Sequence, residues 1–355
     1  MKFEPIALSL MGAFTAALMV TAGFNPPSGE TVSPRPAQSP MALQRAEPLP
    51  LPDGRSPRND KITENQDPAP ITGVDFDMPE FTVASGAAAI GGSARALSSA
   101  FVAMGYHFDK VITGEKAVPR LFLVSLPEDI AKVPENKKRK ALFFRSVLPL
   151  VLQVNEEILA DRKRLWKMRF RVRIGNKPGA ADRLWLDVMT DRYKIKRQNR
   201  IADIDNLIAR VDVIPPSLAL AQAAEESGWG TSRYVREGNA IFGQWTFSAE
   251  SSLVPKDRDA GKKHRVKAFA TLTDSVRAYA RNLNTHRAYR DFRKTRAAIR
   301  RQGAPLDGRL LAGRLTSYSE RGAAYVASLR GLIDSNKLRR LDKARLDNDK
   351  DRPAI

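Results

Sequence analysis

The sequence contains no cysteine and only three histidines, which lie far apart at His107, His264 and His286. Without cysteine the chain can form no disulfide, no thiolate zinc site and no cysteine nucleophile. The pattern H-E-x-x-H, which places two histidine ligands on one helix face, is also absent. A histidine-based metal site is therefore not expected.

Acidic residues are scarce relative to basic ones: 39 Asp and Glu stand against 59 Lys and Arg, a formal net charge of +20. Such a protein is attracted to polyanions, which include nucleic acid, an anionic membrane and bacterial peptidoglycan. The same charge can also form a solvated basic face without a specific partner. Zinc-finger, basic-zipper and aromatic RNA-binding signatures are missing from the sequence. We therefore expect no nucleic acid partner.

Long apolar runs are absent except near the N-terminus, where Ile6 to Ala22 is almost wholly apolar and follows Lys2. Val20 to Ala22 offers the small residues that signal peptidase requires before Gly23, so residues 1–22 are predicted to be a secretory signal. The alternative is an uncleaved anchor that contacts the membrane through this segment, because the run approaches spanning length. Both interpretations place the rest of the chain outside the cytoplasm, in the periplasm or cell envelope.

Prolines punctuate a polar stretch from Pro26 to Pro70. Such a composition buries too little apolar surface to offset the entropy lost on ordering. The sequence therefore predicts a disordered linker at residues 23–95. An N-terminal region with a long helix follows at 96–195, a second helical region at 196–340, and a charged tail, frayed or disordered, at 341–355.

Apolar residues recur at spacings of three and four, which predicts a mainly α body. Lys137 to Lys167 forms one long helical pattern, in which Pro149 should cause a kink or a break. Pro216 is suited to open a helix and Gly228 to end it. Further helices are expected at residues 201–211, 272–289, 297–302, 310–318 and 323–336, one or two strands at 111–125, and a hairpin or long loop at 247–269.

Two adjacent carboxylates, Glu225 and Glu226, stand at the end of the helix that precedes Gly228-Trp229-Gly230. Adjacent helical side chains point about 100° apart, so only one of them can face a cleft that the other does not. The helix C-terminus and desolvation both disfavour the charged carboxylate and raise its pKa. A raised pKa suits a general acid. The alternative is that both glutamates are ordinary exposed residues near a helix cap.

The segment from Pro216 to Ser232, followed by Gly238-Asn239 and by Ile241-Phe242-Gly243, resembles the signature of bacterial glucosaminidases, glycoside hydrolase family 73. The match is closer to the Bax group than to the wall-hydrolase domain of the flagellar protein FlgJ. It continues through residues 282–289 and 318–325, and upstream through 143–157. The resemblance implies a lysozyme-like helical domain with a small β-hairpin lobe at the cleft, and it makes residues 196–340 the catalytic domain.

The resemblance assigns the general acid to Glu226, the glutamate directly before Ser-Gly-Trp-Gly, and turns Glu225 away from substrate. A glycosidase normally uses a second carboxylate. In this family that group comes from the hairpin after the Phe-Gly segment, where we choose Asp257 over Glu250 and Asp259. The N-acetyl group of the substrate is the alternative.

Tyr325 matches a tyrosine that lines the cleft of the family and completes the predicted catalytic set. Core packing is the equal alternative for Trp229 and Phe242. Ala240 stands where the family pattern has an asparagine, so one polar contact is absent. The residues predicted to bind substrate are Trp229, Asn239, Phe242, Gln244, Trp245 and Tyr318.

These expectations together describe a peptidoglycan hydrolase that cleaves β-1,4 bonds on the reducing side of N-acetylglucosamine in glycan strands. Neither a metal nor a cofactor is implied. Two alternatives remain open at the level of sequence. One is a lytic transglycosylase on the same fold, and the other is a wall-binding module without catalytic activity.

Overall fold

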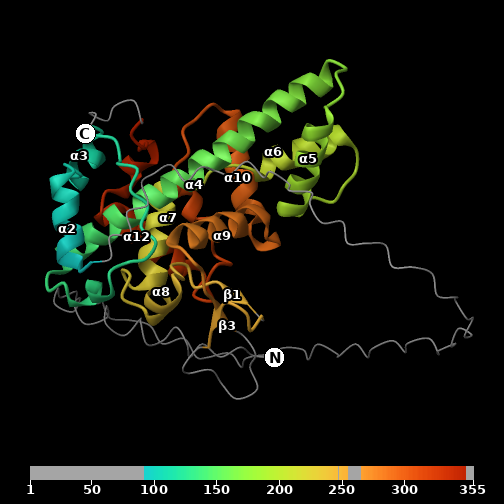
Figure 1. Cartoon of the computed structure of the whole chain (residues 1–355). Helices are drawn as coiled ribbons and strands as arrows, with labels where there is room; N and C mark the ends of the chain where they lie inside the picture. Colours follow the sequence, from blue (N-terminus) through green and yellow to red (C-terminus); the bar gives the residue numbers. More distant parts are fainter. Residues whose placement is uncertain (1–91, 247, 255–264, 349–355) are drawn as a thin grey trace, which may run out of the picture. The chain divides into compact units, whose positions relative to one another are not determined.

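The computed structural model describes residues 92–246, 248–254 and 265–348 (Figure 1). The predicted signal, nearly all of the predicted linker, Asp257, Asp259 and residues 349–355 lie outside this part of the chain. The described elements are helices α2 (Ala94–Ala103), α3 (Phe108–Thr113), α4 (Asn136–Arg173), α5 (Ala180–Arg192), α6 (Arg200–Arg210), α7 (Pro216–Ser227), α8 (Arg233–Gly238), α9 (Leu272–Thr285), α10 (Arg290–Arg301), α11 (Gly308–Ala312) and α12 (Ala323–Ser335), 3-10 helices η1 (Glu128–Lys132), η2 (Arg287–Tyr289) and η3 (Leu338–Lys343), and strands β1 (Trp245–Thr246), β2 (Ser252–Leu253) and β3 (Arg265–Lys267). The prediction of a mainly α fold is confirmed.

Helix α7 lies at the centre of the packing and contacts α4, α11, α12 and η3 (Figure 1). It begins at Pro216 and ends at Gly228, whose φ of 57° is left-handed, as the sequence predicts. Nearly all of its residues are buried, and many of them are alanines, whose small side chains let neighbouring helices approach closely. Only Glu225 and Glu226, in the last turn, are partly exposed, while the other residues of the helix are packed among its neighbours.

Helix α4 runs without interruption from Asn136 to Arg173, so the predicted break at Pro149 is wrong. A proline inside a helix removes one hydrogen bond and costs about 3 kcal/mol. The helix nevertheless continues because apolar side chains on both sides of the proline are buried, among them Val147, Leu148, Leu150 and Val151. Tertiary packing therefore outweighs the local preference.

A small antiparallel sheet forms the only strand structure in the described residues, with the order β1-β3-β2. Trp245 pairs with Val266 in the register of β1 and β3, and Leu253 pairs with the same residue in that of β2 and β3. This sheet confirms the β-hairpin lobe expected from the sequence. Residues 255–264, which connect β2 to β3, are not described.

Other local predictions also differ from the structure. The helix expected at 310–318 ends at Ala312. Residues 111–125 contain no strand; they hold the end of α3 and irregular backbone, with one isolated parallel bridge from Val118 to Leu346. The start of the charged tail is not frayed, because Leu341 and Leu346 are buried and 3-10 helix η3 packs against α7. Short apolar runs do not distinguish a strand from a buried loop. None of the described helices is long and apolar enough to cross a membrane.

A buried ionic cluster holds the connection between α6 and α7. Asp212 is 2% exposed and accepts a hydrogen bond from Arg300 at 2.9 Å. Arg296 is 1% exposed and donates to the backbone oxygens of Asp212 and Val213 at 3.0 Å each. Burial alone would raise the pKa of Asp212, but Arg296, Arg300 and Arg162 hold this pKa below its usual range. The carboxylate therefore remains charged and links α4 and α10 to the start of α7.

Removing the charge of Asp212 should destabilise the protein strongly. We expect Asp212→Asn to lower the free energy of unfolding by about 3 kcal/mol at pH 7, because it leaves buried arginines without their counter-ion. Since the folded pKa is depressed, this stabilisation is present above the unfolded pKa and is lost as pH falls through the folded value. Urea denaturation at pH 7 and at pH 3 measures both effects.

Asp205→Asn is the matched control for this prediction. Asp205 also pairs with two arginines, Arg169 and Arg173, but its side chain is partly exposed. Exposed pairs contribute about 0–1 kcal/mol. Equal losses for Asp205→Asn and Asp212→Asn would contradict the importance of the buried cluster.

Candidate functional site

Glu226 lies in the last turn of α7, where its side chain is partly buried. The hydroxyl of Tyr325, near the start of α12, donates a hydrogen bond to Oε1 of Glu226 at 2.7 Å. Only 1% of Tyr325 is exposed. The structure thus brings together two of the three predicted catalytic residues, which are 99 positions apart in the sequence.

Burial raises the pKa of Glu226 from its ordinary value of 4.5 to about 7. The hydrogen bond from Tyr325 and the charge of Arg321 act in the opposite direction, and the negative charge of Glu225 adds to the increase. The direction confirms what the sequence predicts for a carboxyl at this helix end. A pKa near 7 lets the side chain hold a transferable proton at neutral pH.

Four tyrosines surround this carboxyl. Burial raises the pKa of Tyr279, Tyr289, Tyr318 and Tyr325, and the charge of Glu226 raises each of them further. The ring of Tyr318 stacks in parallel on Tyr325 with centroids 5.6 Å apart, and Tyr289 lies 5.8 Å from Tyr318. The aromatic wall beside the acid is therefore built from tyrosines of α9, η2, the loop before α12, and α12 itself.

A buried chain of hydrogen bonds fixes the direction of the Tyr325 hydroxyl. Tyr279 donates to Oε1 of Gln222 at 2.7 Å, and Nε2 of Gln222 donates to the Tyr325 oxygen at 2.9 Å. With that oxygen accepting from Gln222, the hydroxyl hydrogen points to Oε1 of Glu226. The acidic proton of a neutral Glu226 then belongs on Oε2.

The reverse orientation of the Gln222 amide is unfavourable. It would leave the hydroxyl hydrogen of Tyr279 without an acceptor among the described residues, and Tyr279 is 1% exposed. An unsatisfied buried donor costs about 1–3 kcal/mol. Tyr279 therefore selects the orientation of the Gln222 amide. Through Gln222 and Tyr325, it also determines which oxygen of Glu226 carries the acidic proton.

Glu225 has different partners from Glu226. It forms an ion pair with Arg321 and accepts a hydrogen bond from Ser328 at 3.1 Å. The guanidinium of Arg321 also lies over the ring of Tyr325, 5.4 Å from its centroid. The two adjacent carboxyls thus lie in different environments: Glu225 is paired with Arg321, whereas Glu226 is desolvated and hydrogen-bonded to Tyr325.

The predicted aromatic residues lie in different environments. Trp229 packs edge-on against Phe143 and Phe144, with centroids 6.1 and 5.1 Å away. Phe242 is buried, and its ring stacks on that of Tyr279 with centroids 3.8 Å apart. It therefore helps to fix the position of Tyr279 in the chain of hydrogen bonds. Trp245, on β1, is 59% exposed.

The polar residues that the sequence predicts to bind substrate, Asn239 and Gln244, do not bond to Glu226. Asn239 donates to the backbone oxygens of Phe269 and Ala270 at 3.2 and 3.1 Å. Nε2 of Gln244 is buried without a hydrogen-bond partner among the described residues. Asp257 is not described, so its role stays a prediction. No group of three or more acidic or histidine side chains in the described residues is arranged to hold a metal ion.

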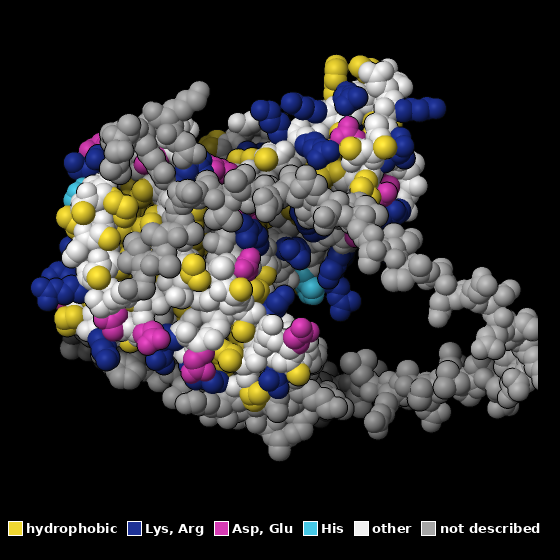
Figure 2. All heavy atoms as spheres, viewed as in Figure 1, with side chains coloured by type: hydrophobic (Ala, Val, Ile, Leu, Met, Phe, Trp, Pro, Cys, Tyr) yellow, Lys and Arg dark blue, Asp and Glu magenta, His cyan; other side chains and the backbone are white. Residues whose placement is uncertain are grey.

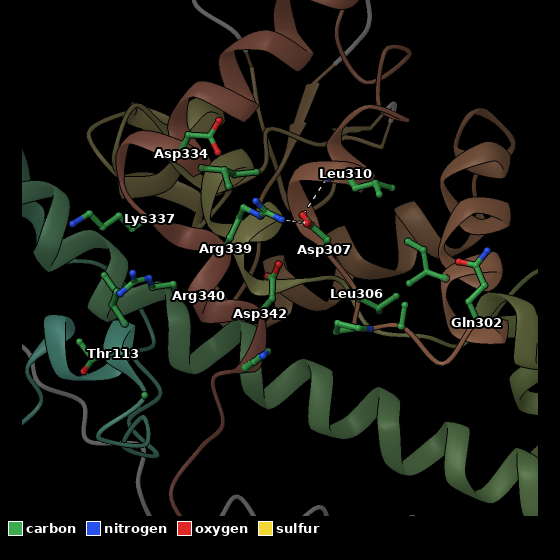
Figure 3. Close-up of a pocket in the computed structure, with 17 residues that line it drawn as sticks. Thr113, Gln302, Leu306, Asp307, Leu310, Asp334, Lys337, Arg339, Arg340 and Asp342 are labelled. Atoms are coloured by element: carbon green, nitrogen blue, oxygen red, sulfur yellow. Dashed lines mark hydrogen bonds and ion pairs between the residues drawn. The ribbon is translucent and has the colours of Figure 1, made fainter.

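A separate hollow of about 980 Å³ lies between the ends of α3, α10, α12 and η3 (Figure 3). Its acidic residues are occupied: Asp307 pairs with Arg339, and Asp342 accepts from the backbone nitrogens of Gly308 and Ser217 at 2.9 Å. Asp342 thereby ties the start of α7 to α11 and η3. None of the residues that contact Glu226 lines this hollow.

Sequence reasoning missed Gln222, Tyr279, Tyr289 and Arg321. Gln222 precedes Glu226 by four positions, so helical periodicity alone places both on one face of α7. The other three are brought to the site by tertiary packing. Tyr289 and Arg321 lie within the segments 282–289 and 318–325 that carry the family resemblance, whereas Tyr279 lies outside them.

Comparison with known proteins assigns the chain to a family. A glucosaminidase family, described as mannosyl-glycoprotein endo-beta-N-acetylglucosaminidase, matches residues 202–338. Protein bax of Escherichia coli (strain K12) is 34% identical over 215 residues, which cover 60% of this chain and 75% of that protein. No solved structure matches significantly. The chain belongs to the glucosaminidase family. Within that family it is of the Bax type, as its motifs predict.

Neutralising Glu226 should stabilise the folded protein at high pH. The folded pKa of about 7 lies above the ordinary 4.5, so the ionised side chain opposes folding as pH rises. At about 1.4 kcal/mol per pKa unit, Glu226→Gln should gain about 3 kcal/mol at pH 8 and less than about 0.5 kcal/mol near pH 4.5. Thermal unfolding across this range measures the difference, and Glu225→Gln, which loses its pair with Arg321, should show no such gain.

Proposed function

We propose that this chain is an N-acetylglucosaminidase that cleaves peptidoglycan glycan strands, with Glu226 as its general acid. Membership of the glucosaminidase family supports peptidoglycan hydrolysis in general. The observation that carries the specific assignment is the buried carboxyl of Glu226, whose pKa of about 7 and contact with Tyr325 suit proton donation. The positive charge of the chain suits a polymer whose lactyl and peptide groups are anionic.

In the proposed reaction, Glu226 protonates the glycosidic oxygen as the bond to the anomeric carbon breaks. The Tyr325 hydroxyl stabilises the carboxylate that results, because it donates to Oε1 in that state as well. The positive charge that develops on the sugar is balanced by a second group. Asp257 is our candidate, and the acetamido oxygen of the substrate is the alternative. Water then completes hydrolysis.

The proposed substrate contacts come from Tyr318, Trp245 and Gln244. Tyr318 lies against Tyr325, and Trp245 on β1 offers an exposed ring to a sugar face. Gln244 has an amide nitrogen without a partner among the described residues. Phe242 and Asn239 support the segment that precedes β1. Trp229 packs mainly against Phe143 and Phe144. Export to the periplasm or cell envelope brings the enzyme to this substrate.

Glu226→Gln should abolish digestion of purified sacculi in a zymogram, with a loss of at least about 100-fold, because the amide cannot donate a proton to the leaving group. Glu225→Gln is the matched control and should keep most of the activity. Mass spectrometry of the products distinguishes the alternatives. Reducing N-acetylglucosamine ends support the proposal, anhydro-muramic ends indicate a lytic transglycosylase, and binding without release of fragments indicates a wall-binding module.

Tyr279→Phe should lower kcat about tenfold while KM changes little, because the Gln222 amide loses the donor that orients it. Weaker donation from Tyr325 to Glu226 should also raise the pKa of the acid, so the alkaline limb of the pH profile should move upward from about pH 7. Tyr106→Phe removes another buried hydroxyl, one without a hydrogen-bond partner among the described residues. An unchanged pH profile in Tyr279→Phe would contradict the idea that the chain of hydrogen bonds sets the pKa of Glu226, even if Glu226 is the acid.

A further inference from the structure

The outer part of α4 exposes a row of large apolar side chains. Leu159, Trp166 and Phe170 are 45%, 46% and 66% exposed, and Ile174, the C-cap residue of the helix, is 58% exposed. At about 100° per residue, their spacings of seven, four and four residues place all four within about 80° of one another. They form one continuous face, here called the outer stripe.

The outer stripe points away from the protein core. Ile158, Leu165 and Met168 are the buried residues of the same part of α4, and helical periodicity puts them on the opposite side. Helix α5, joined to α4 through the ion pairs of Asp182 with Arg164 and Arg171, carries two more exposed apolar residues, Leu184 and Val188. The stripe therefore has no partner in the described part of the chain that matches its apolar character.

Basic side chains accompany the outer stripe. Lys163 and Lys167 are exposed, and neither forms an ion pair with any described residue. At about 100° per residue, Lys163 lies within the arc of the stripe, between Leu159 and Trp166 along the helix, and Lys167 lies at its edge. Arg169 and Arg173 lie along its other edge, where both pair with Asp205. Figure 2 shows apolar and basic side chains mixed over the region of α4 and α5 at its upper right. Large apolar residues flanked by lysine and arginine are typical of helices that lie in a membrane interface.

We propose that the outer stripe docks this protein on an anionic phospholipid surface, with its apolar side chains at the level of the headgroups. Tryptophan and phenylalanine are well suited to that depth, and lysine can extend from it to reach lipid phosphates. Charge complementarity favours a lipid surface over a second copy of this chain. Two copies paired through the stripe would bring Lys163 and Lys167 close to the equally basic edge of the partner.

The full-length protein can be tested with vesicles of equal parts phosphatidylglycerol and phosphatidylcholine, and with phosphatidylcholine alone. We expect a blue shift of tryptophan emission with the anionic vesicles that Trp166→Phe removes, which makes the readout local to the stripe. Phe170→Glu should prevent the shift. Lys163→Gln combined with Lys167→Gln should weaken binding to anionic vesicles by about thirtyfold.

Val102→Glu is the matched control, since Val102 is 55% exposed on α2, outside the stripe; it should bind as the unchanged protein does. An emission shift that persists in Trp166→Phe, or equal binding by Phe170→Glu, would place lipid contact elsewhere on the chain and overturn the proposal. A dimer in solution that Phe170→Glu dissociates, without any response to vesicles, would instead identify the stripe as a contact between two copies. Neither result depends on the catalytic role of Glu226.

Discussion

The removal of water from one carboxyl group is the constraint on which the site depends. In water a glutamate is ionised at neutral pH and cannot serve as an acid. Burial at the end of α7 raises the pKa of Glu226 to about 7, and this requires a helix that its neighbours can approach closely. Ala219, Ala221 and Ala223, all fully buried, provide that close approach. The raised pKa of Glu226 therefore depends on small residues that are themselves buried in the core.

The two ends of α7 are held by different kinds of polar network. At the start, Asp212 and Asp342 are acceptors for arginines and backbone nitrogens, which fix the position of the helix. At the end, Gln222, Tyr279 and Tyr325 form a chain of neutral donors that leads to Glu226. A cationic side chain in direct contact with Glu226 would lower the pKa of the acid, so a neutral chain can orient the carboxyl while preserving its proton. The ionised partner, Arg321, is instead paired with Glu225.

Much of this arrangement could be predicted from the sequence where local chemistry determines it. Proline and glycine mark the limits of α7, and the adjacent glutamates at its end, together with the family motif, lead to the proposal of Glu226 as the acid. Local patterns failed where distant contacts decide the outcome. Pro149 does not break α4, and Leu346 is buried because it meets Val118, more than 200 positions away. Tyr279 reaches Gln222 only through the packing of α9 beside α7, for which periodicity gives no indication.

The excess of basic residues has more than one physical use, so net charge alone is a poor guide to partners. Arg296 is buried and donates to the backbone oxygens of Arg210, Asp212 and Val213, and therefore contributes to the fold rather than to a surface field. Arginine suits this role because its planar guanidinium can satisfy several acceptors at once. The lysines of the outer stripe, by contrast, remain in solvent without an ion pair to any described residue. Attraction to anionic polymers or lipids must come from this second group, because a buried charge already neutralised by Asp212 adds little to the field outside the protein.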